Sequence, residues 1–174
     1  MNFIWSNIFR DKKDAEDNTL ELLRKVPIFA ELKKRELSEF QRISHSRSYE
    51  KSETIFWEGE PGVGMYIIQS GRVQITQKCD EHSTGNILAE LKNGDFFGEL
   101  ALLDDSPRSA CAIAAEPTKV IGIFRPDLLS LFDRKPHLAI SVLFKLADMI
   151  GNRLKATNQE LKKLQEKLNT GKTS

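Results

Sequence analysis

The middle of the chain, from residue 49 to residue 124, is a series of short β-prone runs broken by turn residues. Two of the turns, Ser70-Gly71 and Asn93-Gly94, place glycine where a tight hairpin requires a positive φ angle. Many short strands with closely spaced turns are typical of an antiparallel sandwich or barrel. The sequence therefore predicts a mainly β domain with strands at residues 54–57, 65–69, 72–77, 86–91, 95–97, 111–115 and 119–124.

One window in this region departs from the β pattern. It runs from Phe97 to Ala110 and reads FGELALLDDSPRSA. Gly98 has no side chain to keep an anion away from the unpaired N–H groups that begin a short helix. Pro107 cannot continue that helix, so the chain should turn and bring Arg108 back toward the helix start. A guanidinium in that position can bind two oxygens of one phosphate group.

A carboxylate, Glu99, stands beside this predicted anion site. Because two anions repel each other, the carboxylate needs another partner, and a ribose hydroxyl next to the phosphate would be one. The window therefore predicts a site for a nucleotide with a compact phosphate. The alternative is that residues 97–103 are a buried apolar segment that Pro107 and Arg108 merely end.

The window resembles the phosphate-binding cassette of the cyclic nucleotide-binding domain family. The family pattern runs F-G-E-x-A-L, a few variable residues, then P-R-x-A, and it is matched here by Phe97, Gly98, Glu99, Ala101, Leu102, Pro107, Arg108 and Ala110. The E-G-x-P-G turn at residues 58–62 also has the family's usual form. The resemblance covers about residues 26–158. It implies an antiparallel, jelly-roll-like β-roll with N-terminal helices and a long C-terminal dimerisation helix.

The resemblance also implies which residues contact the ligand. The phosphate would be bound by Arg108, Ser109 and the main-chain N–H groups around Ala101 and Leu102. The ribose would be bound by Gly98, Glu99 and Leu100, with Glu99 accepting a hydrogen bond from the 2′-hydroxyl. We expect Ile75 and Leu88 to form an apolar floor. The Ser109 hydroxyl can contact either the phosphate or a guanine edge, so it does not decide between cAMP and cGMP. The expected ligand is cAMP, and cGMP is the second candidate.

Three residues near the C-terminal end are further candidates. In transcriptional activators of the family a Thr-Ser pair of the long helix reaches the purine; Thr157 matches the threonine, and Asn158 replaces the serine. The alternative is that Thr157 is a tolerated polar residue at a helix interface. Arg153 matches an arginine that pairs with the ribose-binding glutamate, which would orient Glu99.

The C-terminal region, residues 136–174, is predicted to be one long helix, which Pro136 can open. From there Leu143, Ile150, Thr157 and Leu164 alternate with Ala147, Leu154, Leu161 and Leu168 in a seven-residue repeat. Such a repeat is typical of a coiled coil, and it predicts a parallel homodimer. The alternative is a single helix folded back on its own domain, which explains the stretch up to about residue 150.

Upstream of the β region, apolar residues at helical spacing predict two helices, one from residue 19 to 26 and one over 35–43. We divide the chain into residues 1–18, an N-terminal amphipathic segment and linker; 19–135, the nucleotide-binding unit; and 136–174, the long helix. The apolar residues of the first ten are too few to span a membrane. We expect this segment to pack on its own domain or on a dimer mate, with membrane contact as the less favoured alternative.

Composition excludes several other classes of function. The formal net charge of +1 does not call for nucleic acid, and too little chain follows Asn169 for a helix-turn-helix domain, so we expect no direct DNA binding. The three histidines lack metal-ligand spacing, and no nucleophile-base pair appears, so no metal, cofactor or catalytic residue is expected. The two cysteines are too few for a disulfide framework, which favours a reduced, cytoplasmic setting.

The sequence thus predicts a regulatory sensor with an unknown protein partner. The alternative is a scaffold that keeps the fold and binds no nucleotide.

Overall fold

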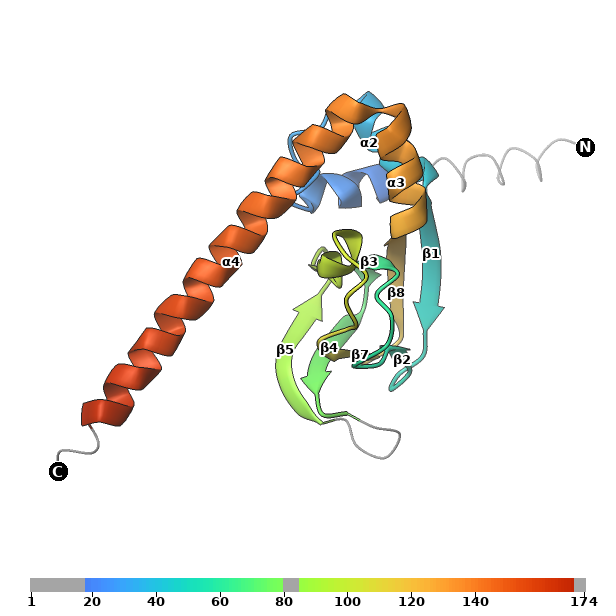
Figure 1. Cartoon of the computed structure of the whole chain (residues 1–174). Coiled ribbons are helices and arrows are strands. Elements are labelled where there is room, and N and C mark those ends of the chain that lie inside the picture. Colours follow the sequence, from blue (N-terminus) through green and yellow to red (C-terminus); the bar gives the residue numbers. More distant parts are fainter. Residues whose placement is uncertain (1–17, 80–84, 171–174) are drawn as a thin grey trace, which may run out of the picture.

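Two antiparallel sheets form the body of the protein, whose computed structural model describes residues 18–79 and 85–170 (Figure 1). One sheet has the order β1 (Ser44–Tyr49), β8 (Thr118–Phe124), β3 (Gly64–Ser70) and β6 (Phe96–Phe97). The other has the order β2 (Thr54–Phe56), β7 (Cys111–Ala114), β4 (Arg72–Gln77) and β5 (Asn86–Lys92). The prediction of an antiparallel β-roll is confirmed.

The helices meet at one end of the roll, and the last of them extends away from it (Figure 1). Residues 18–25 are helical. Helix α2 (Lys34–Arg42) follows, and the Glu36 carboxylate accepts a hydrogen bond from the Lys33 backbone N–H at its start. After β8 the chain forms α3 (Arg125–Arg134) and α4 (Pro136–Thr170). The two N-terminal helices and α4 lie close to where the apolar spacing and Pro136 predicted them.

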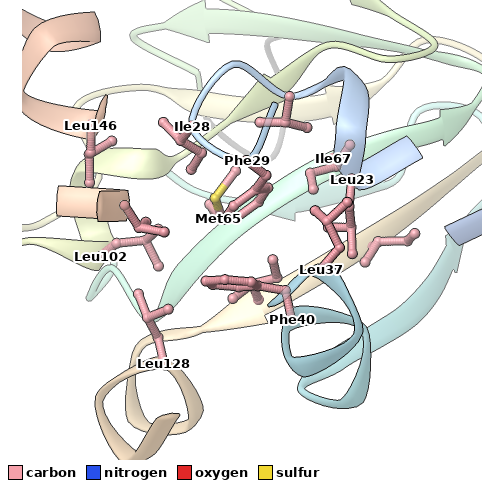
Figure 2. Close-up of a cluster of buried hydrophobic side chains, with 14 of the residues drawn as sticks. Leu23, Ile28, Phe29, Leu37, Phe40, Met65, Ile67, Leu102, Leu128 and Leu146 are labelled. Atoms are coloured by element: carbon pink, nitrogen blue, oxygen red, sulfur yellow. The ribbon is translucent and has the colours of Figure 1, made fainter. Parts of the chain in front are cut away.

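A hydrophobic core joins this helical end to the sheet that contains β3 (Figure 2). The Phe29 and Phe40 rings meet with centroids 4.5 Å apart, and the core also takes in Met65 of β3. Leu102 of the predicted cassette and Leu146 of α4 are buried in the same cluster. The cassette and the start of α4 are therefore packed into one core, which couples their positions.

Helix α4 contacts the domain only over its first half. Leu138, Val142 and Leu146 are buried, whereas the described side chains beyond Gly151 are exposed, Leu154 at 59%. The far end of the helix stands apart from the sheets (Figure 1). Packing on its own domain therefore accounts for α4 up to about residue 150, as the second interpretation of the repeat required. The apolar repeat beyond that point lacks cover within the described chain.

Two cysteines form a disulfide that the sequence analysis did not predict. Cys79 and Cys111 are bonded with their Cα atoms 6.5 Å apart. They are 32 residues apart in sequence, but β4 and β7 are neighbours, and Thr76 of β4 lies opposite Cys111. The expectation of two reduced cysteines is therefore wrong for this structure, because a cysteine count carries no information about strand pairing.

The predicted amphipathic segment at residues 1–10 lies outside the described residues. Within the described part of the chain, no helix has both the length and the apolar character that a membrane span requires.

The two hairpin glycines differ in what a side chain would meet. Gly71 and Gly94 both have positive φ angles, +93° and +90°. A Cβ at Gly71 would lie 2.5 Å from the Thr118 hydroxyl oxygen and 2.7 Å from the Pro117 carbonyl oxygen, whereas one at Gly94 would meet nothing within 4 Å. A side chain would strain the backbone at both positions, but it would clash with neighbouring atoms only at Gly71.

We therefore expect unequal losses of stability from Gly71→Ala and Gly94→Ala. Gly94→Ala should lower the free energy of unfolding by about 1 kcal/mol through backbone strain alone. Gly71→Ala should lower it by about 2 kcal/mol, because overpacking adds to the same strain. Denaturant unfolding of both variants checks this, and equal losses would contradict it.

Candidate functional site

A cavity of about 540 Å³ opens between the second sheet, the window that resembles the cassette, and α4. Phe56 of β2, Ile75 of β4, and Ala89 and Leu91 of β5 line its apolar side. Residues 96–101, 103, 104 and 106–110 line the other side, and Arg153 reaches the cavity from α4. An apolar concavity with a few converging polar groups is the usual form of a small-molecule site.

The window begins with a backbone conformation that glycine favours. Gly98 has φ +73° and lies in the left-handed region, and a one-turn 3₁₀ helix, η1 (Glu99–Leu102), follows it. A Cβ at Gly98 would lie 2.6 Å from Nη1 of Arg108. The left-handed backbone therefore favours glycine here, and a side chain would also displace the Arg108 guanidinium.

The Arg108 guanidinium is buried at the start of η1, as the turn at Pro107 predicted. Its Nη1 donates a hydrogen bond to the Gly98 carbonyl at 3.1 Å, and its Nη2 donates to the Gly64 carbonyl at 2.8 Å. The residue is 7% exposed, and its Nε is buried without a hydrogen-bond partner. Burial lowers the pKa of the Arg108 guanidinium, although nearby Tyr66 and two glutamates oppose this effect. The site thus holds a desolvated cation that can still donate further hydrogen bonds.

Backbone hydrogen bonds fix the Arg108 main chain. The Arg108 N–H donates to the Glu60 carbonyl, and the Gly59 N–H donates to the Arg108 carbonyl, both at 2.8 Å. Pro61 and Pro107 form an isolated β-bridge beside them. The turn at residues 58–62 and the end of the cassette therefore form one unit.

Glu99 is 5% exposed, and its carboxylate pairs with the Arg153 guanidinium of α4. The Arg153 guanidinium carbon also lies 5.3 Å from the centroid of the Phe96 ring. A buried carboxylate is costly unless it is paired. Arg153 supplies that partner, in the position from which it was expected to orient Glu99, and it connects the cassette to the long helix.

Most of the residues expected to bind a ligand surround this cavity. The structure places Ile75, Gly98, Glu99, Leu100, Ala101, Arg108, Ser109 and Arg153 along its walls. Leu102 does not line the cavity, because its side chain is buried in the core that Figure 2 shows. Thr157 and Asn158 are exposed and do not line the cavity either, because this part of α4 does not pack against the domain.

Leu88 was chosen for the apolar floor, but it is 57% exposed and does not line the cavity. Ala89 lies directly opposite Ile75, and a register shift follows between Ile75 and Thr76. Residues opposite each other in a sheet share a face, so Ala89 and Leu91 lie on the cavity side. The floor was misassigned because hydrophobicity was used where strand register decides.

Sequence reasoning missed Phe56, Ala89, Leu91 and Phe96 as lining residues. Phe56 ends a short β run just before the turn at residues 58–62, so its place beside the cassette follows from the backbone bonds described above. Phe96 precedes the cassette directly, which was the one local signal available.

Comparisons with known proteins agree with this geometry. A family model for the cyclic nucleotide-binding domain matches residues 46–135. The cyclic AMP receptor protein of Thermus thermophilus is 38% identical over 127 residues, which are 72% of this chain and 54% of that protein. The cAMP-dependent protein kinase regulatory subunit of Dictyostelium discoideum is 36% identical over 107 residues, 60% of this chain and 33% of that protein.

A solved structure shows a similar fold. The catabolite activator protein of Thermus thermophilus superposes with a TM-score of 0.68 at 33% sequence identity, over 79% of this chain and 62% of that one. This chain therefore spans only part of the relatives that it resembles. The family match nevertheless covers more than half of the 174 residues and includes the whole cassette. The chain belongs to the cyclic nucleotide-binding domain family.

Proposed function

We propose that the protein is a regulatory sensor that binds a cyclic nucleotide in the cavity between β5, the cassette and α4. The observation that carries this proposal is the buried Arg108 guanidinium, whose Nε has no hydrogen-bond partner. A desolvated cation is costly unless it is paired, and a bound phosphate would supply an anion for it. A cyclic phosphate is compact enough to sit between Arg108 and the N–H groups of η1.

The expected ligand is cAMP, and cGMP is the second candidate. Both relatives described above are named for cAMP. Ser109 lines the cavity, where its hydroxyl can serve either the phosphate or a guanine edge. Glu99, held by Arg153, is assigned to the ribose 2′-hydroxyl. Ile75, Ala89 and Leu91 would form the apolar floor, in place of Leu88.

The long helix is the proposed output. Leu102 and Leu146 share one core, and Glu99 pairs with Arg153, so both contacts connect the cassette to α4. A ligand changes the arrangement of α4 only if it binds one arrangement more tightly. We propose that the exposed repeat including Leu154, Leu161 and Leu164 forms a homodimer seam whose geometry responds to the ligand. An unidentified protein partner remains part of this proposal.

Titration calorimetry of the full chain tests the proposal. cAMP, cGMP and the non-cyclic adenosine 5′-monophosphate would be injected separately, with light scattering before and after. We expect one cAMP bound per chain, weaker binding of cGMP, and little heat from the non-cyclic control, because its phosphate carries an additional charge and lacks the ring. No heat from either cyclic nucleotide would overturn the proposal and favour a scaffold.

A valine at position 157 separates the two interpretations of Thr157. Thr157→Val keeps the shape and removes the hydroxyl, so self-association should become severalfold tighter. If the hydroxyl also reaches the base, with α4 closer to the cavity than in this structure, affinity for cAMP should fall roughly three- to tenfold, the contribution of one hydrogen bond. Light scattering and calorimetry measure the two effects. Unchanged affinity would assign Thr157 to the seam alone.

A further inference from the structure

We propose that Phe56 is a positioning residue that fixes the plane of the Arg108 guanidinium and thereby sets which phosphate oxygen the site prefers. The inference rests on the proposed function and concerns the same cavity. It assigns to an apolar side chain a part in the recognition of an anion.

The ring lies against the cation at close range. The guanidinium carbon of Arg108 is 4.0 Å from the centroid of the Phe56 ring, and 5.9 Å from that of Tyr66. A cation over an aromatic face within about 6 Å is attracted by the ring quadrupole, and this attraction grows when the pair is desolvated. Arg108 is buried, so the contact with Phe56 belongs to the stronger kind.

Three contacts together restrict the guanidinium. The Gly98 and Gly64 carbonyls each accept a hydrogen bond from one terminal nitrogen, and the Phe56 ring covers one face. Hydrogen bonds to the two nitrogens alone leave the group free to tilt, because such bonds tolerate a range of angles. A flat ring against one face removes that freedom, so the guanidinium plane keeps a fixed direction.

The ring itself is held in place. Its centroid lies 5.8 Å from that of Phe97 and 6.0 Å from that of Tyr66. One residue further on, the Trp57 N–H donates to the Glu60 carboxylate, and the Glu60 carbonyl accepts the Arg108 N–H. The backbone segments that carry the ring and the guanidinium thus belong to one hydrogen-bonded unit.

The two phosphorothioate diastereomers of cAMP test the inference, because each replaces a different exocyclic phosphate oxygen with sulfur. A guanidinium fixed in one plane should bind the two unequally, whereas one that tilts should accommodate both. Calorimetry with cAMP and both diastereomers would compare the parent with Phe56→Leu, Phe56→Met and Phe56→Tyr. Val73→Ala is the matched control, because Val73 is fully buried in the same cluster as Phe97 and does not line the cavity.

We expect both aliphatic variants to bind cAMP roughly tenfold more weakly, in line with the loss of a desolvated cation–π contact. Their ratio of affinities for the two diastereomers should approach one. Phe56→Tyr should keep the parent's affinity and ratio. Val73→Ala should lower the unfolding temperature while leaving the ratio unchanged, since a packing loss affects both diastereomers alike.

An aliphatic variant that keeps the parent's ratio would overturn the inference, even with weaker binding, because Phe56 would then act through packing alone. A collapsed ratio in Val73→Ala would overturn it as well. If the parent protein binds none of the three compounds, both the proposed function and this inference fail. Binding by the parent together with an unchanged ratio in both aliphatic variants removes only the role of Phe56.

Discussion

Arg108→Ala should weaken cyclic nucleotide binding by roughly a hundredfold or more. The substitution removes the cation expected to bind the phosphate, and removing one partner of a buried charge pair typically costs about 3–5 kcal/mol. Nothing else among the described cavity residues offers a buried cation at the start of η1. Calorimetry with cAMP measures the loss.

A lysine at the same position separates charge from geometry. Arg108→Lys keeps the charge, but it cannot place donors on the Gly98 and Gly64 carbonyls and on a phosphate in one plane. We expect it to be clearly impaired as well. A lysine variant that binds like the parent would show that charge alone matters, and near-native affinity in Arg108→Ala would remove Arg108 from the role. The unfolding temperature of each variant must be followed, because both lose the two carbonyl contacts.

Glu99→Ala is expected to weaken cAMP binding by about ten- to a hundredfold. The carboxylate is buried beside Arg108 in the cavity wall, and a hydrogen bond to a charged group contributes about 1.5–3 kcal/mol. The analogue 2′-deoxy-cAMP makes this test specific, because it lacks the hydroxyl that Glu99 should accept. The parent should discriminate against the analogue by a similar factor, and the variant should bind the two ligands almost equally.

Arg153→Ala is the control for this experiment, because it leaves the carboxylate in place and removes only its partner from α4. We expect a smaller loss of affinity and retained discrimination against the deoxy analogue. If Glu99→Ala still discriminates as the parent does, the ribose is bound by another group. If Arg153→Ala alone abolishes discrimination, the helix contact, not the carboxylate itself, carries the selectivity.

The cassette could be interpreted from the sequence because its parts are local. Gly98, Glu99 and Arg108 lie within eleven residues, and the return of Arg108 to the Gly98 carbonyl follows from the turn at Pro107. The strands could be anticipated for a similar reason, since each hairpin glycine acts on its own neighbours. The helix in the cassette is nevertheless shorter and tighter than a helical run of apolar residues suggests.

The opposite wall of the cavity was harder to predict from the sequence, because it depends on pairing between distant strands. Ala89 and not Leu88 faces the cavity, as a consequence of the register between β4 and β5. Phe56 reaches Arg108 across 52 positions of sequence, and the Cys79–Cys111 disulfide depends on the neighbouring positions of β4 and β7. Composition and spacing contain none of this information.

By itself, the amino-acid sequence determined the family, the β-roll and the window that resembles the phosphate-binding cassette, because each depends on short-range turn chemistry and on residues a few positions apart. Only the tertiary structure decided which apolar side chains face the cavity, where Leu102 is buried, and where α4 leaves the domain. Those outcomes are set by strand register and by packing between segments far apart in the chain. A shift of one residue in register would turn every side chain of the shifted strand to the opposite face of the sheet.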